Sequence, residues 1–236
     1  MVPENKNSEH KSFVSISKES LSQLPVATYT GEICVIDAKS QIKAAVEELK
    51  KAPIIGFDTE TRPSFKKGQS YKVALIQLST PERCYLFRTN IIGLPQELID
   101  IFEDPNLLKV GLSIHDDFHS LHKFDDIKTD INPESFIDLQ SYVKNFRILD
   151  NSLSRLYGIL FGERISKSQR LTNWEAASLT EGQKIYAALD AYACIRIYNY
   201  LKEGNFDPSK SQYLVNPEEQ VQEENKDQVN PENEKE

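Results

Sequence analysis

The chain has 236 residues, of which 39% are hydrophobic and 27% charged, enough to bury the core of one large domain. It has no run of about 18 apolar residues, as a transmembrane helix requires, and its polar first ten residues lack a signal-peptide core. The net charge of -8 does not exclude a nucleic-acid partner, because nine acidic residues and only three lysines fall within residues 207–236. We therefore expect a soluble, cytoplasmic protein with no membrane partner and a nearly neutral folded body.

Composition also sets the expected domain boundaries. Residues 1–20 are polar and show no periodicity, which predicts a disordered N-terminal segment. Residues 208–236 are rich in Gln, Asn, Pro and Glu, which predicts an acidic disordered tail. A single domain over residues 21–207 is left between them.

Apolar periodicity predicts the elements of this domain. In chain order we expect a strand at 31–37, a helix at 39–51, strands at 54–60, 73–79 and 84–87, a helix at 94–102, a strand at 108–112, a helix at 116–123, a strand at 136–138, and helices at 139–146, 152–161 and 180–202. The three strands from 54 to 87 follow one another without a helix, which is typical of an antiparallel meander. The later alternation of helices and strands predicts an α/β domain whose mixed sheet is covered by helices.

The strand at 54–60 ends in two acidic residues. Side chains two positions apart on a strand share a face, so Asp58 and Glu60 point the same way as Ile54 and Gly56. Two carboxylates at the end of a buried strand repel each other unless a shared proton, a basic partner or a metal ion compensates them. The simpler interpretation is a solvated turn that begins after Phe57.

Further acidic residues follow two predicted elements. Asp116 and Asp117 come directly after a strand, and Asp190 lies on the apolar stripe of the last helix with Tyr186 one turn before it. Four inward carboxylates in one crevice would need cations, and oxygen ligands suit two Mg²⁺ or Mn²⁺ ions. Alternatively, an acid at 116 or 117 stabilises a helix N-terminus, and the tyrosine is an ordinary core residue.

A second cluster is formed by three histidines, His115, His119 and His122, spaced by four and three residues. Such spacing can bind zinc, and a His-Asp pair is also found in metal-dependent phosphohydrolases. The one other histidine is His10, so the extra ligands of such an enzyme are missing. A solvated face or a substrate contact is the preferred interpretation.

The acidic residues lie in three motifs that resemble those of a known family. The motifs are Phe57-Asp-Thr-Glu60, Val110-Gly-Leu-Ser-Ile-His-Asp-Asp117 and Tyr186-Ala-Ala-Leu-Asp190. In this order they resemble the DEDD superfamily of 3'-5' exonucleases, in its tyrosine-bearing branch, and within it the Werner-syndrome exonuclease domain and ribonuclease D. The segments 73–78, 153–156, 173–174 and 179–193 extend the likeness to roughly residues 30–203.

The resemblance implies an RNase H-like fold over residues 21–207, two divalent cations and stepwise release of nucleoside 5'-monophosphates. It implies a role for each matched residue: the metal ligands would be Asp58, Glu60, Asp117 and Asp190, and the attacking water would be positioned by Glu60 and Tyr186. A five-residue offset from Leu112 selects Asp117, with Asp116 as the alternative. In the family a larger aromatic residue often stands at the position of His119.

Substrate contacts are expected from Thr59, His119, Lys167 and Arg170. The last two belong to a wider set of basic residues in the loops 61–72 and 162–174, namely Arg62, Lys66, Lys67, Lys72, Arg164, Lys167 and Arg170. Such residues attract a phosphate backbone. Phe65 and Trp174, in the same loops, are interpreted as packing residues and not as base platforms.

The favoured function is that of an active exonuclease acting on the 3' end of single-stranded nucleic acid, with DNA favoured over RNA. It would serve DNA repair or RNA processing, and a helicase would have to act in trans. The alternative is a catalytically weak nucleic-acid-binding or scaffold module with a nuclease fold. The presence of all four acidic residues and the tyrosine favours catalysis.

Overall fold

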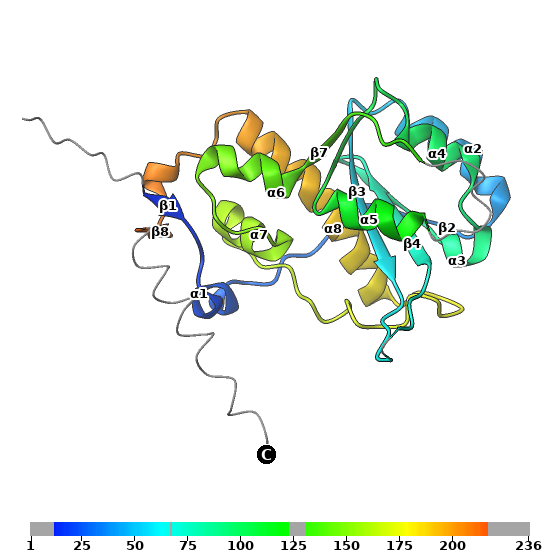
Figure 1. Cartoon of the computed structure of the whole chain (residues 1–236), viewed down its shortest axis with the longest axis horizontal. Coiled ribbons are helices and arrows are strands. Elements are labelled where there is room, and N and C mark those ends of the chain that lie inside the picture. The colour runs from blue at the N-terminus through cyan, green and yellow to red at the C-terminus, as the bar shows by residue number, and fades with distance from the viewer. Residues whose placement is uncertain (1–11, 67, 123–130, 217–236) are drawn as a thin grey trace, which may run out of the picture.

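The computed structural model describes residues 12–66, 68–122 and 131–216, which form a mixed sheet packed between two layers of helices (Figure 1). The strands are β1 (Phe13–Val14), β2 (Glu32–Ile36), β3 (Ile54–Thr61), β4 (Val73–Ser79), β5 (Arg83–Phe87), β6 (Leu108–Gly111), β7 (Phe136–Asp138) and β8 (Leu214–Val215). The helices are α1 (Lys18–Gln23), α2 (Lys39–Leu49), α3 (Thr89–Ile92), α4 (Gln96–Phe102), α5 (Ile114–Leu121), α6 (Leu139–Tyr142), α7 (Leu153–Phe161) and α8 (Glu181–Lys202). Two short 3-10 helices are η1 (Val143–Phe146) and η2 (Pro208–Lys210).

The main sheet has six strands in the order β2-β5-β4-β3-β6-β7. The strands β3, β4 and β5 form the expected antiparallel meander. The strands β2, β6 and β7 each run parallel to their inner neighbour. The α/β class with a mixed, helix-covered sheet is therefore confirmed.

The central strand β3 separates two hydrophobic cores. Ile54 belongs to the core beneath α8, whereas Ile55 and Phe57 belong to the core beneath α2, α4 and α5. A Cβ atom on Gly56 would lie 1.9 Å from the carbonyl oxygen of Ala191, so only glycine lets α8 cross β3 this closely. The face that carries Gly56 continues into the two acidic residues at the end of the strand.

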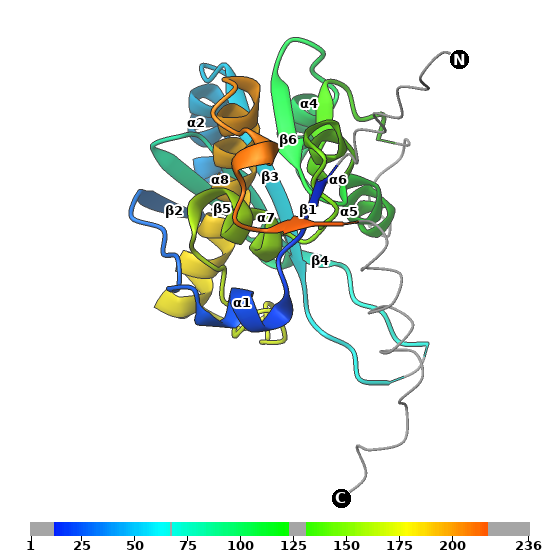
Figure 2. The same ribbon diagram turned by 90° about the vertical axis from the view of Figure 1, so that its left-hand side faces the viewer.

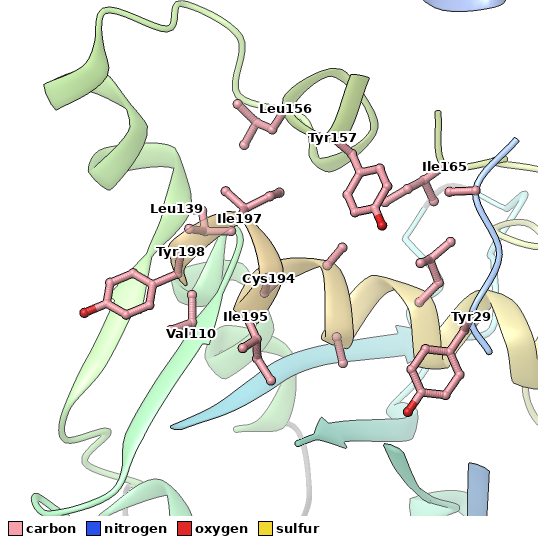
Figure 3. Packing of buried hydrophobic residues seen from close by; sticks show 14 of the residues in the cluster. Tyr29, Val110, Leu139, Leu156, Tyr157, Ile165, Cys194, Ile195, Ile197 and Tyr198 are labelled. Carbon is pink, nitrogen blue, oxygen red and sulfur yellow. The ribbon is translucent and has the colours of Figure 1, made fainter. Parts of the chain in front are cut away.

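The long helix α8 spans the sheet and supplies much of the first core. Its N-terminus is capped by Thr180, whose hydroxyl accepts from the backbone N–H of Gln183 at 3.2 Å. Figure 3 shows side chains of α8, including Cys194 and Ile197, packed between the sheet and α7. The expected inward stripe is confirmed, since Asp190 keeps only 6% of its surface exposed.

Described residues on either side of the expected domain 21–207 also pack onto it. Val14 and Ile16 are fully buried, and β1 pairs with β8 in a small antiparallel sheet (Figure 2). Asp150 accepts from the Ile16 backbone N–H at 2.9 Å and pairs with Arg155 at 2.7 Å. Short apolar pairs such as these show no periodicity in sequence. Residues 1–11 and 217–236 lie outside the described residues.

This packing predicts that the last described strand stabilises the fold. A chain ending at Asn216 should melt at a higher temperature than one ending at Lys210, which loses β8 and uncovers Val14. We expect a loss of about 1–3 kcal/mol, or a Tm lower by about 2–10 °C, measured by calorimetry at equal pH. Equal midpoints would show that β8 contributes nothing to stability.

Other differences concern helix boundaries. The helix expected at 116–123 begins at Ile114, since Ser113 in a left-handed conformation (φ 64°) turns the chain directly out of β6. The short helix α3 was not predicted, because four residues cannot show a helical period. None of the described helices is long and apolar enough to cross a bilayer.

Candidate active site

Three acidic side chains meet where the end of β3 passes under α8. Asp58 and Glu60 come from β3 and Asp190 from the middle of α8, and one carboxylate oxygen of each lies within 4.8 Å of the other two. The alternation of side chains along β3 and the close contact at Gly56 together produce this meeting. Glu60 and Asp190 are buried, and Asp58 is half-buried.

Asp117 lies beside this group, on the first turn of α5. Its carboxylate accepts a hydrogen bond from the Thr59 hydroxyl, on the strand residue between the two β3 acids. The turn is held by Asp138 at the end of β7, whose carboxylate accepts from the backbone N–H groups of Ser113 (3.2 Å) and Ile114 (3.0 Å). Two strands of the sheet thus fix the helix that carries Asp117.

The geometry distinguishes Asp117 from its neighbour in sequence. The side chain of Asp116 is 82% exposed, accepts from the Ser113 hydroxyl at 2.7 Å and lies 3.7 Å from His115. Asp117 is half-buried and close enough to Asp58 for their charges to interact. The expected choice of Asp117 over Asp116 agrees with this placement.

Burial and mutual repulsion make the four carboxylates costly to ionise. Burial raises the pKa of Asp190 to about 7, and burial together with Asp58 raises the pKa of Asp117 to about 8. The pKa of Glu60 rises to about 10, through burial and then the charges of Asp58 and Asp190. Burial followed by the charge of Asp190 also holds the pKa of Asp58 well above its ordinary value. In the absence of cations the cluster retains protons near neutral pH.

The donor set fits divalent cations. Within the described ranges, no lysine or arginine forms an ion pair with Asp58, Glu60 or Asp190. All available donors are carboxylate oxygens, which suit Mg²⁺ or Mn²⁺ better than zinc. The cluster therefore has the chemistry of a hard-cation site.

Tyr186 stands one helical turn before Asp190 and hydrogen-bonds to it. Its ring lies 6.1 Å from the ring of the fully buried Trp174, which limits its movement. Burial, followed by the charges of Asp190 and Glu60, raises the pKa of the hydroxyl far above its ordinary value. Tyr186 is thus held as a neutral hydroxyl facing the acidic group.

Asp58, Glu60 and Asp190 form the floor of a cleft of about 370 Å³, whereas Asp117 lies beside them and does not line it. One wall, from the loop between α7 and α8, brings the exposed side chains of Lys167 and Arg170, and Arg170 lowers the pKa of Glu60 against the effect of burial. The remaining lining residues are Thr59, Leu112, Gln140, Asn151, Ser152, Leu153, Ser154, Ile165, Tyr186 and Cys194. Three of the four expected substrate contacts thus lie in the cleft.

The neutral polar wall of the cleft was not predicted. Gln140 is the second residue of α6, and Ser152 is the N-cap residue of α7, with Asn151 before it. The signal in sequence is weak, because polar residues at the starts of helices are ordinarily caps. The wall is assembled from two helices, and Gln140 joins it by donating to the Asn151 carbonyl at 3.3 Å.

The loop that forms the charged wall is anchored by a buried arginine. Arg88, 1% exposed, donates to the carbonyl oxygens of Ala176 and, at 3.4 Å, Ala177. Gln183 donates from the other side to Thr172 at 2.9 Å. These contacts place Lys167 and Arg170 on a fixed segment.

The structure does not bring His119 into the cleft. It lies with His115 and His122 along a separate pocket on the outer face of α5. Within the described residues, the one group of three or more potential metal ligands is the carboxylate cluster, so the three histidines do not converge. Residues 117 and 119 lie about 200° apart around the axis of α5, so the side chain of His119 points away from Asp117. The expected substrate contact of His119 is therefore not supported.

Two further expectations concerning the loops are corrected. Arg164 does not flank the cleft, since its side chain donates to the Leu24 carbonyl at 3.1 Å. Trp174 is a packing residue, as expected, but Phe65 is 82% exposed and packs in no core. Lys67 lies outside the described residues.

A mixed sheet with a carboxylate cluster at the end of its central strand is the arrangement of the RNase H-like class of nucleases. The family profile described as 3'-5' exonuclease matches residues 33–204, and the chain belongs to this family. It is 33% identical over 203 residues to the mouse bifunctional 3'-5' exonuclease/ATP-dependent helicase WRN, covering 82% of this chain but only 14% of that protein. The family expected from the motifs is thereby confirmed.

Solved structures show the same fold. The EXO domain of Nibbler from Aedes aegypti superposes with a TM-score of 0.65 at 23% identity, covering 78% of this chain and 97% of that one. RNase D of Escherichia coli gives a TM-score of 0.60 at 24% identity, covering 74% of this chain and 45% of that one. The RNase H-like arrangement is thus shared with exonuclease domains of this family.

Proposed function

We propose that the protein is a metal-dependent exonuclease that removes nucleotides stepwise from the 3' end of single-stranded nucleic acid and releases nucleoside 5'-monophosphates. The observation that carries this proposal is the carboxylate cluster on the floor of a cleft with Lys167 and Arg170 on its wall. An acidic floor alone would repel a phosphodiester, so the site is suited to one only when divalent cations neutralise it. Membership of the 3'-5' exonuclease family supports the direction of attack.

Asp58, Glu60, Asp117 and Asp190 would hold two divalent cations, Mg²⁺ or Mn²⁺, which supply a nucleophilic water and stabilise the leaving oxygen. The chain holds these ligands rigidly. Thr59 orients Asp117, and the Gly56 contact fixes the distance from β3 to α8. Lys167 and Arg170 would bind the phosphates of the substrate strand.

Glu60 and Tyr186 would position the attacking water. Because Tyr186 remains a neutral hydroxyl, it donates a hydrogen bond and does not act as a base. Its single O–H bonds to Asp190 in the metal-free cluster and would be donated to the water once cations occupy the Asp190 oxygens. An ionised Glu60 is an acceptor, so a water between the two side chains would be oriented by one donor and one acceptor. This orientation is what the tyrosine adds to the carboxylates.

Tyr186→Phe should therefore reduce kcat by about 10- to 100-fold with little change in KM, because only the orientation of the water is lost. Metal affinity, measured by titration calorimetry, should remain within about twofold of the wild type. Tyr192→Phe, on the same helix but outside the cleft lining, is the matched control and should retain the full rate. An unchanged rate for Tyr186→Phe would return this tyrosine to a purely structural role.

The size of the cleft supports a single-stranded substrate. A volume of about 370 Å³ is at the small end of ligand sites and suits one terminal nucleotide, not a continuous duplex. We propose DNA as the favoured substrate with RNA as a second one, and a helicase acting in trans where a duplex must be opened. A cytoplasmic location is proposed on composition alone.

The direct test uses labelled single strands of DNA and RNA with Mg²⁺ or Mn²⁺ and resolves product length. We expect a ladder shortened from the 3' end, release of 5'-monophosphates, and strong slowing by a 3'-phosphate but not by a blocked 5' end. A circular single strand should remain intact. Internal cleavage of that circle, or shortening from the 5' end, would overturn the proposal.

A further inference from the structure

The loop between β3 and β4, residues 62–72, leaves the sheet directly beyond the acidic strand end (Figure 2). Its sequence contains four basic residues and no acidic one. Lys66 is exposed, and Arg62 pairs with Glu175 of the α7–α8 loop at 3.2 Å. The loop thus presents Lys66 to solvent, and the Arg62–Glu175 ion pair ties it to the loop that carries Lys167 and Arg170.

Phe65 is the exceptional residue of this loop. It is 82% exposed, whereas every other phenylalanine in the described parts of the chain is buried or half-buried. An exposed aromatic ring does not contribute the large free energy of stabilisation that its burial would give. A single exposed apolar residue is common on protein surfaces. Phe65, however, lies four residues after the end of β3, the strand that carries Asp58 and Glu60, and between Arg62 and Lys66 in the sequence.

The loop has internal contacts that hold its base in place. The Arg62 guanidinium lies 4.9 Å from the centre of the Tyr71 ring, and Gln69 donates to the Tyr71 hydroxyl at 2.8 Å. The Ser64 hydroxyl bonds to the carbonyl of Lys66 at 3.2 Å. Phe65 is therefore presented by a braced segment that also contacts the opposite loop.

The geometry points to Phe65 as a base-stacking residue for the nucleotides that precede the terminal one, an inference that rests on the proposed function. The cleft suits a single nucleotide, so the rest of the strand must leave over its rim. Phe65 lies no more than about 18 Å from Glu60, the reach of five extended residues. A flat ring flanked by cations matches the bases and phosphates of single-stranded nucleic acid. Leu171, 60% exposed on the other loop, offers no such ring face.

Phe65→Ala should raise KM for a 12-nucleotide single strand about 5- to 100-fold, the range for loss of one stacked base. Its kcat, and its kcat/KM for a dinucleotide that ends within the cleft, should equal those of the wild type. Phe65→Trp should restore the low KM, because it preserves a stacking face. Leu214→Ala, which removes an exposed apolar side chain from β8, is the control and should change neither substrate's kinetics.

Binding separates this inference from the proposed function. The affinity of a fluorescent 12-nucleotide strand for wild type and Phe65→Ala can be measured by anisotropy without turnover, in calcium. If the wild type degrades single strands but Phe65→Ala keeps the wild-type KM and affinity, the stacking role is overturned and the exonuclease stands. If Phe65→Ala weakens binding but the wild type degrades no substrate, the proposed exonuclease function is overturned and the base-stacking role of Phe65 stands.

Discussion

Asp190→Asn is expected to lower the exonuclease rate by at least about a thousandfold. The substitution removes one carboxylate from the group in which Asp58, Glu60 and Asp190 meet, and the loss of a metal-ligating charge costs several kcal/mol of transition-state stabilisation. Rates on a labelled single strand, with metal varied to saturation, measure this effect. A rate close to wild type would overturn the assignment of the cluster as the catalytic centre.

The same variant should fold at least as stably as the wild type when no metal is present. Asparagine removes a charge from a crowded buried group, and its carbonyl still accepts the hydrogen bond from Tyr186. Asp116→Asn provides the matched control for the acids of α5, because Asp116 is exposed while Asp117 accepts from Thr59. Asp117→Asn should lose activity, and Asp116→Asn should keep it.

The metal-free protein is expected to become less stable as pH rises from about 5 to 8.5. In the folded chain the pKa values of Asp190 and Asp117 are raised to about 7 and about 8, above those of unfolded carboxylates near 4. The folded state therefore holds protons that the unfolded state has released, and stability is lost as pH passes through the folded pKa values. Since a tenfold difference in acid dissociation constant between the two states corresponds to about 1.4 kcal/mol, the Tm should fall by at least about 5 °C.

Saturating Mg²⁺ or Mn²⁺ should abolish most of the decrease of Tm with rising pH, because cations replace the protons of the cluster. The comparison is a set of melting curves at several pH values with EDTA or with metal. Asp190→Asn should show a shallower slope in EDTA than the wild type. A metal-free protein whose Tm rises with pH over this range would contradict the charge repulsion inferred for the site.

The sequence predicted the catalytic floor well because its signals are local. Asp58 and Glu60 are two positions apart on one strand, and Asp190 lies on a stripe whose helical period is unbroken for more than five turns. Hydrophobic periodicity does not show which strand and which helix cross. The prediction that the acids of β3 and α8 meet therefore depended on the family motifs. Gly56 permits the crossing in the structure, but a glycine within a strand does not state which element approaches it.

The parts that were missed depend on long-range packing. The substrate contact of His119 was expected from its place in the family motif, which does not show that residues 117 and 119 face different sides of α5. The polar wall joins Gln140 of α6 to Ser152 at the start of α7 through the hydrogen bond from Gln140 to the Asn151 carbonyl, and it therefore depends on contacts between separate elements. Val14 and Ile16 looked like part of a polar tail until their burial against distant segments was seen.

The contact between Gly56 and Ala191 makes the spacing of the metal-binding acids a property of the core. Asp58 follows this contact by two residues on β3, and Asp190 precedes it by one on α8, so both carboxylates are mounted beside a single point where backbone touches backbone. A gap set by atoms in direct contact cannot widen without opening the interior. The distance between the two carboxylates is thus set by the same atoms that seal the interior, so a core substitution that separates β3 from α8 would also change the geometry offered to the proposed cations.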